Sequence, residues 1–404
     1  MHKILIISPH FPTPDIYDDL SKDPRSKFLL NYAEEFVNIG YSVTVIHSVQ
    51  RYPFYINAII NCLSIISPKF LKFKQNPEVV LKNTYASSGV NIIRKPINKY
   101  IPHSRISNRE VRKFAGIIRD ELNCSFQDFN LILLDYLSPS LDMADFLGAE
   151  LNQRVNVIFH QTDESYLKKN LEFYRTRLMK CDGVIYRNQS ARDKITSKYR
   201  VKNVSHLMYS GIPNSQEFGL PRHKVRKLLF VGRILESKRI HDVILALNKL
   251  PKIIKDNIKF EIVGDGEYKP VLKDLVTKLN LTENVKFTSK IPHTEVFEKM
   301  QQCDAFVMVS KETFGMVYVE ALSQGCIVIA AKNEGIDGVV NDGQNGFLTS
   351  IGDVNNLSKI LTKLYLMNSS DVTNLSFNGI ETAKKMQNKT LAKDFIDNLV
   401  ESRE

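Results

Sequence analysis

Short apolar runs rich in β-branched residues alternate with longer amphipathic stretches along most of the chain, and this alternation predicts a β/α protein with parallel sheets. In the first half, strands are expected at 4–8, 43–46, 129–134, 155–159 and 183–186, with a helix at 27–39. In the second half, strands are expected at 228–232, 259–263, 285–288, 305–309 and 326–331. Helices are expected at 240–250, 268–279, 294–302, 316–324 and 390–404. The pattern therefore predicts an α/β fold with two doubly wound sheets.

The segment 51–100 interrupts this alternation. Its aromatic and apolar residues, as in Tyr52-Pro-Phe-Tyr-Ile56, are mixed with lysines, as in Phe70-Leu-Lys-Phe-Lys74. A helical insertion that packs on its own domain with its lysines in water fits this pattern. An amphipathic helix that lies in a membrane interface fits it equally well. Both interpretations stay open.

The charge distribution singles out the same part of the chain. The net charge is +11, and residues 51–113 hold twelve Lys and Arg against Glu78 and Glu110. A basic surface of this kind serves nucleic acid, an anionic membrane or an anionic substrate. Because zinc-finger, RRM and KH signatures are missing from the sequence, we expect no nucleic acid partner. An anionic membrane surface remains a candidate partner.

Length and composition narrow the class of protein. A chain of 404 residues is long enough for about two domains, and its composition is that of a soluble globular protein. The first residues run into an apolar strand rather than a signal peptide, and no apolar run approaches the ~18 residues of a membrane span. Five scattered cysteines without CxxC spacing argue against a zinc site or a disulfide framework. We therefore expect reduced thiols and a cytoplasmic location.

Polar residues follow several of the expected strands. Ligands of open α/β sheets bind at the carboxyl ends of strands, and the free N–H groups at helix starts bind phosphate. Glu312 follows strand 305–309, Gly315 precedes helix 316–324, and Glu320 lies more than a turn inside that helix. Val317, Ala321 and Leu322 are expected on its sheet-facing side. A phosphorylated ligand is therefore predicted at this edge.

This region resembles a known family. The pair Glu312 and Glu320, with seven residues between them and Ala-Leu-x-x-Gly after them, is similar to the E-x7-E signature of retaining GT-B glycosyltransferases of the family 4 type. Four flanking motifs agree in order and spacing, at 231–238, 262–267, 334–338 and 341–348. The resemblance covers roughly residues 227–363. It implies two Rossmann-like domains that face a cleft.

The resemblance assigns catalytic and donor-binding roles to charged residues of the second domain. Arg233 and Lys238 would hold the diphosphate of a nucleotide-sugar donor, so neither a metal nor another cofactor is expected. Departure of the diphosphate builds negative charge, which such cations stabilise in the transition state. Glu312 would bind the transferred sugar, and Glu320 would accept hydrogen bonds from the ribose hydroxyls.

Further site residues follow from the same resemblance. Phe314, Gly315 and Met316 would donate main-chain N–H groups to the donor, and Gly264 would line its site in a supporting role. Gly264 and Gly266 do not belong to a GxGxxG motif, because Lys269 occupies the third glycine position. In the first domain, His160 would lie near the transferred sugar. A strand-end histidine satisfied by backbone groups is the alternative for this residue.

The resemblance also implies that the two domains have different roles. Residues 1–210 would form the acceptor-side domain, with a basic aromatic insertion at 51–113. Residues 211–388 would bind the nucleotide sugar, and 389–404 would form a helix that crosses back to the first domain. The loop after the first strand departs from the family, because it has no glycine between Met1 and Gly40. Its contribution to donor binding is therefore in doubt.

The predicted function is that of a retaining hexosyltransferase. It would move a sugar from a UDP- or GDP-sugar to a glycan or lipid-linked acceptor in surface polysaccharide synthesis, in the cytoplasm and peripherally at the inner membrane face. Two alternatives stay open. A nucleotide-sugar epimerase or phosphorylase would use the same scaffold without an alcohol acceptor. A non-catalytic sugar-nucleotide-binding subunit would explain the missing glycine loop.

Overall fold

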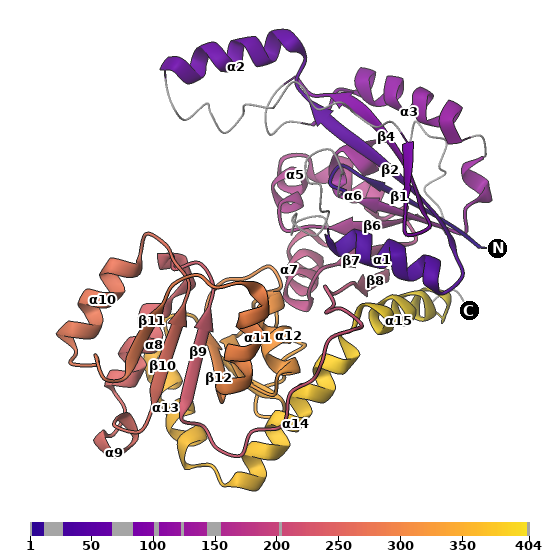
Figure 1. Ribbon diagram of the computed structural model, residues 1–404. Coiled ribbons are helices and arrows are strands. Elements are labelled where there is room, and N and C mark those ends of the chain that lie inside the picture. The colour runs from indigo at the N-terminus through magenta and orange to yellow at the C-terminus, as the bar shows by residue number, and fades with distance from the viewer. Residues whose placement is uncertain are drawn as a thin grey trace. The chain divides into compact units, whose positions relative to one another are not determined.

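The computed structural model describes residues 2–11, 27–66, 84–100, 105–122, 125–143, 155–201 and 204–401. The chain divides into two compact units, shown in Figure 1. Unit 1 consists of Met1–Arg187, Arg192–Met208 and Ala392–Glu404, and unit 2 of Asn188–Ala191 and Tyr209–Leu391. The lysines of the 70–74 run and most of the loop after the first strand lie outside the described residues.

Unit 1 is built on an eight-stranded sheet with the order β3-β4-β2-β1-β5-β6-β7-β8. Its strands are β1 (Lys3–Ser8), β2 (Ser42–Arg51), β3 (Thr84–Ser87), β4 (Val90–Asn98), β5 (Leu131–Asp135), β6 (Val155–Phe159), β7 (Gly183–Tyr186) and β8 (Val204–Leu207). Its helices are α1 (Lys27–Asn38), α2 (Phe54–Ile66), α3 (Asn108–Leu122), α5 (Asp163–Lys169), α6 (Leu171–Leu178), α7 (Gln189–Tyr199) and the end of α15 (Asn388–Glu401). All neighbouring strands run parallel except β3 and β4.

The strand order reverses between β1 and β5. From β1 the chain adds strands outward on one side, and after β4 it returns to the other side of β1 to form β5. Such a reversal leaves a crevice at the carboxyl ends of the two strands, where ligands of open sheets bind. In unit 1 this edge carries Ser8 and Asp135, the last residues of β1 and β5.

The prediction that 51–100 lies outside the β/α pattern is wrong for its second half. Strand β4 pairs with β2 over eight positions, from Thr44 opposite Asn91 to Arg51 opposite Asn98, so β2 is also longer than the expected 43–46. Helix α3, which begins within the range assigned to a basic insertion, then lies against β4. The sequence hid β4 because charged and proline residues follow its apolar start, although Arg94 is itself buried.

Helix α2 is the part of that segment that does form a helix outside the sheet. Figure 1 shows it standing away from the sheet of unit 1. Three of its large apolar side chains are exposed, Tyr55 by 55%, Ile59 by 53% and Ile65 by 86%. Among the residues that the structure describes, no helix has both the length and the apolar composition needed to cross a membrane.

Unit 2 is built on a six-stranded parallel sheet with the order β11-β10-β9-β12-β13-β14. Its strands are β9 (Lys227–Val231), β10 (Lys259–Val263), β11 (Val285–Thr288), β12 (Ala305–Met308), β13 (Ile327–Ala331) and β14 (Gly346–Thr349). Its helices are α8 (Ile240–Asn248), α9 (Lys252–Lys255), α10 (Lys269–Lys278), α11 (His293–Gln302), α12 (Met316–Ser323), α13 (Val354–Leu366) and α14 (Ser369–Lys385). The predicted α/β fold with two largely parallel sheets is confirmed.

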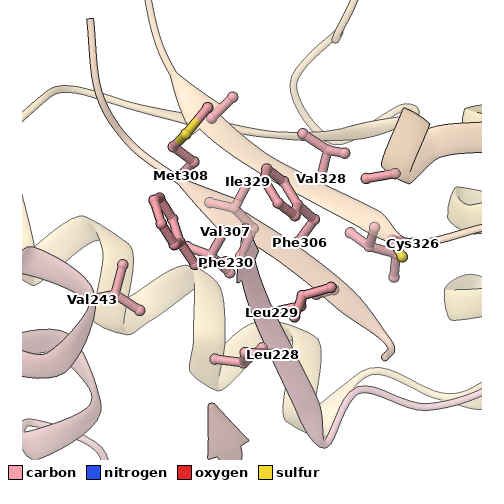
Figure 2. Close-up of a cluster of buried hydrophobic side chains, with 14 of the residues drawn as sticks. Leu228, Leu229, Phe230, Val243, Phe306, Val307, Met308, Cys326, Val328 and Ile329 are labelled. Carbon is pink, nitrogen blue, oxygen red and sulfur yellow. The ribbon is translucent and has the colours of Figure 1, made fainter. Parts of the chain in front are cut away.

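The core of unit 2 lies where β9, β12 and β13 meet the helices. Figure 2 shows Leu229, Phe230 and Phe306 there, all almost fully buried. The strands are buried on both faces, which explains their continuous apolar sequence. In helix α12 the expected orientation needs a correction. Val317 is only half-buried, and Tyr318 and Val319 occupy the buried face instead.

The last helix packs its apolar side on unit 1. Helix α15 ends at Glu401, close to the expected 390–404. The Phe395 ring lies 6.1 Å from Tyr32 and 6.2 Å from Phe36, both on α1. Aromatic rings at such distances contribute beyond their buried area, so this contact helps to fix the end of the chain on unit 1.

Candidate active site

The sheet of unit 2 also reverses its strand order, between β9 and β12. The chain runs outward from β9 through β10 to β11, and then returns to the other side of β9. Two loops therefore meet at the carboxyl ends of neighbouring strands, one after β9 and one after β12. The first carries Arg233 and Lys238, and the second carries Glu312. This is the position where a ligand of an open sheet binds.

Lys238 and Glu312 form an ion pair across these loops. The Lys238 Nζ lies 2.5 Å from the Glu312 Oε1, and the Ser310 hydroxyl donates to the same oxygen at 2.8 Å. Both charged side chains are mostly buried, with 22% of Lys238 and 15% of Glu312 exposed. Arg233 is exposed, and its side chain has no hydrogen bond or ion pair with the described residues. The structure thus brings two of the four predicted catalytic residues into contact.

The loop after β10 packs closely against the loop after β9, through backbone hydrogen bonds. The Gly232 N–H donates to Val263, and the Ile234 N–H donates to Asp265. A Cβ on Gly264, whose φ is +141°, would overlap the carbonyl oxygen of Gly232. This close approach alone requires glycine at position 264. The predicted role of Gly264 in donor binding remains a prediction.

The start of α12 has its own steric requirement. Gly315 precedes the helix with φ +81°, and a Cβ there would lie 2.5 Å from the ring of Tyr318. The Tyr318 hydroxyl donates to the Met308 carbonyl at 2.7 Å, which ties the helix to the end of β12. The N–H groups of Met316 and Val317, the first two of α12, have no acceptor within the helix. They remain available to an anion, whereas the Phe314 side chain before them is buried.

Glu320 lies on α12 with 17% of its side chain exposed, and its Oε1 is 3.2 Å from the His293 Nε2. His293 opens α11 and is itself 67% exposed. Sequence reasoning did not select His293, because it follows Pro292 at a helix start and belongs to none of the matched motifs. Among the described residues, no hydrogen bond joins Glu320 to the pair formed by Lys238 and Glu312.

Unit 1 carries a second polar cluster at its strand reversal. The His160 Nε2 lies 2.6 Å from the Asp135 Oδ1, and the Ser8 hydroxyl donates to the Asp135 Oδ2 at 2.6 Å. Ser8 and Asp135 are buried, and His160 retains 16% exposure. His160 therefore binds a carboxylate, and the alternative of a histidine satisfied by backbone groups does not describe its ring. The link to Ser8 was not foreseen, since 127 residues separate it from Asp135.

The described residues contain no group of three or more His, Cys, Asp and Glu that could hold a metal ion. The two polar clusters differ in their charged groups. In unit 2 the loop after β9 brings the exposed Arg233 and the ammonium group of Lys238 to the edge where Glu312 lies. In unit 1 the Asp135 carboxylate is surrounded by donors of its own unit. The first cluster fits a ligand with several negative charges, and the second fits hydroxyl groups.

Comparisons with known proteins agree with this architecture. The family model for glycosyl transferases group 1 matches residues 212–386. The lipopolysaccharide core biosynthesis glycosyltransferase LpsE of Rhizobium meliloti is 31% identical over 156 residues, which cover 38% of this chain and 44% of LpsE. The chain is thus matched to less than half of the length of that relative.

Solved structures extend the likeness to the whole chain. Sucrose-phosphate synthase of Thermosynechococcus elongatus aligns with a TM-score of 0.67 and 18% identity, over 100% of this chain and 99% of that one. HepE of Anabaena, solved with UDP and glucose, aligns with a TM-score of 0.58 and 16% identity, over 99% and 100%. These likenesses confirm the predicted GT-B fold.

Proposed function

We propose that this chain, whose residues 212–386 belong to the glycosyl transferases group 1 family, transfers a hexose from a nucleotide sugar to an alcohol acceptor with retention of configuration. The contact between Lys238 and Glu312 at the strand reversal of unit 2 carries this proposal. A donor site needs a cation for the leaving phosphate and an acceptor for the sugar hydroxyls, and these two side chains supply both.

In the proposed donor site, Arg233 and Lys238 bind the diphosphate. The exposed guanidinium of Arg233 has no competing carboxylate in the described residues, so its fork of donors is available to phosphate oxygens. The N–H groups at the start of α12 add uncharged donors. Glu320 binds the ribose diol. Because two cations and a helix start offset the charge of the leaving group, no metal ion is required in this proposal.

UDP and GDP sugars are the proposed donors. The complex of HepE with UDP and glucose supports UDP first, since HepE shares the fold over almost its whole length. The name of LpsE supports a surface glycan or its lipid carrier as the acceptor. His160 would bind the transferred sugar, and Asp135 would lie on the acceptor side.

We also propose that unit 1 brings the enzyme to an anionic membrane surface, as a peripheral protein of the cytoplasmic face. The apolar residues exposed on α2 support this, because water disfavours such side chains and a membrane interface accepts them. Changing both Ile59 and Ile65 to Ser should weaken binding to vesicles of about 30% phosphatidylserine roughly 30-fold in co-sedimentation, because each side chain contributes on the order of 1 kcal/mol. Equal binding of wild type and variant would remove α2 from the interface.

Thermal stabilisation tests the donor assignment. The purified chain is heated with UDP, GDP and ADP and with their glucose or mannose conjugates, in EDTA. A ligand at ~100 times its Kd adds about 2.7 kcal/mol, which moves the melting temperature by several degrees. A shift with one base in EDTA supports the metal-free donor site and is followed by transfer assays. The absence of any shift would reject that site.

The transfer assays that follow separate the alternatives. Product formation from the donor without an alcohol acceptor would indicate an epimerase or phosphorylase. Nucleotide binding without turnover, across acceptors of the glycan and lipid classes, would indicate a binding subunit. Transfer to an added alcohol acceptor, with retained anomeric configuration by NMR, supports the proposed reaction.

A further inference from the structure

Asp163 joins the exit loops of two neighbouring strands in unit 1. It opens α5, and only 1% of its surface is exposed. Its Oδ2 accepts the His160 N–H at 2.9 Å, just after β6. Its Oδ1 accepts the Leu137 N–H at 3.2 Å, two residues after the end of β5. The side chain of one buried aspartate therefore holds both loops by their backbones.

These loops carry the groups around the His160 ring. Tyr136 lies between Asp135 and Leu137 and has φ +71°, a conformation that is costly for a residue with a side chain. Its ring stacks on the His160 ring, with 3.8 Å between centroids and 9° between planes. The surrounding structure must hold Tyr136 in this conformation. The bond from Asp163 to the next N–H contributes to this, together with the Tyr136 N–H, which donates to the Ile158 carbonyl at 3.0 Å.

We propose that Asp163 is a positioning residue for sugar transfer, which holds His160 and Tyr136 in place through its two backbone hydrogen bonds without touching the substrates. This inference rests on the proposed function. Burial raises the pKa of Asp163 to about 8, although the two backbone donors act in the opposite direction.

An asparagine at this position keeps the size and removes one of the two acceptors. In Asp163→Asn one side-chain oxygen still accepts an N–H, whereas the amide group faces the second N–H with a donor of its own. One of the two loops is thereby released. Asp182 offers a matched control, because it lies just before β7. It is therefore at the amino ends of the strands of the same sheet, whereas His160 follows the carboxyl end of β6. Asp182→Asn should leave transfer unchanged.

The experiment combines kinetics with a spectroscopic measurement. We expect Asp163→Asn to lower kcat/KM for the acceptor roughly ten- to a hundredfold, as small misplacements do, while UDP affinity changes less than about twofold. The ¹⁵N NMR signals of the His160 imidazole, assigned with His160→Gln, should shift in Asp163→Asn and not in Asp182→Asn. If Asp163→Asn does not fold, Asp163→Ser, which is smaller and keeps one acceptor oxygen, is measured in the same way.

The outcomes separate the inference from the proposed function. Unchanged kcat/KM and unchanged His160 signals in an active enzyme overturn the positioning role and leave the function intact. A loss of kcat/KM with unchanged His160 signals also overturns it, because the effect would not pass through His160. If the wild type transfers no sugar, shifted His160 signals confirm only that Asp163 fixes His160. In that case the role in transfer falls together with the function.

Discussion

The ion pair between Lys238 and Glu312 leads to a prediction about nucleotide affinity. Changes at the two residues should alter this affinity in opposite directions. In the free protein, Glu312 neutralises Lys238 at 2.5 Å. A diphosphate that uses the ammonium group must compete with that carboxylate. Removing Lys238 should therefore weaken nucleotide binding, and neutralising Glu312 should strengthen it, even though both changes abolish transfer.

The expected magnitudes follow from the geometry. Lys238→Ala removes a charge-assisted hydrogen bond worth about 1.5–3 kcal/mol, which weakens binding by about 10- to 150-fold. Glu312→Gln releases Lys238 from a partly exposed pair worth up to about 1 kcal/mol, which tightens binding up to about fivefold. In the double variant, the two effects should not add, because both changes act on one contact.

Calorimetric titration with UDP in EDTA at fixed ionic strength measures both variants. Lys299→Ala is the matched control, because Lys299 pairs with Glu261 at 2.9 Å and is similarly shielded, at 26% exposure. That pair lies away from both loops, so the control should bind UDP like the wild type. If Glu312→Gln weakens UDP binding as much as Lys238→Ala does, the pair is structural and Lys238 does not bind the diphosphate.

Three further predictions concern single residues. Glu320→Ala should weaken UDP binding about tenfold through lost ribose contacts, whereas His293→Ala should not, and equal titrations of Glu320→Ala and wild type would refute the ribose role. Tyr318→Phe leaves the Met308 carbonyl without its 2.7 Å donor and should lower the free energy of unfolding by about 1–3 kcal/mol in urea, so an unchanged midpoint would contradict the importance of this bond. Burial, assisted by His10, lowers the pKa of His47 from 6.5 to about 4, so the unfolded chain gains its proton first and stability falls as the pH drops from 6.5 to 4. The loss is roughly 3 kcal/mol, and His47→Gln should remove it from the pH profile of the melting temperature, whereas a parallel profile would refute it.

The hydrophobic pattern was sufficient for most strands that are buried on both faces, although the fully buried β14 was not expected. Each strand expected in the second half of the chain is present within one or two residues. The signal is clearest for β12 and β13, which are apolar and buried throughout, as parallel strands covered by helices are. Strand β4 escaped prediction because its polar residues conceal the alternation. Arg94 within it is buried, and a single sequence does not distinguish such an arginine from a solvated one.

The site residues were predictable where their position follows from the order and direction of the strands. The rule that ligands bind at strand ends placed Lys238 and Glu312 at one edge, and the structure brings them into contact. The rule identified His160 in the same way. It did not reveal Asp163, whose two hydrogen bonds depend on the backbone path of two loops and not on any spacing of residue types. Side chains that hold backbone groups leave little trace in a sequence.

The electrostatics of the two polar clusters supports assigning the donor to unit 2 and the acceptor to unit 1. Asp135 is buried and already accepts from Ser8 and His160, so it offers nothing that would attract a diphosphate. Arg233 is exposed, and Lys238 is held by a carboxylate that a diphosphate can replace. A ligand with two phosphate groups gains most where cations are available at a helix start, and a neutral sugar hydroxyl gains most where donors and acceptors are already fixed. The opposite assignment would place a diphosphate beside the buried Asp135 carboxylate, whose two oxygens are already occupied by Ser8 and His160.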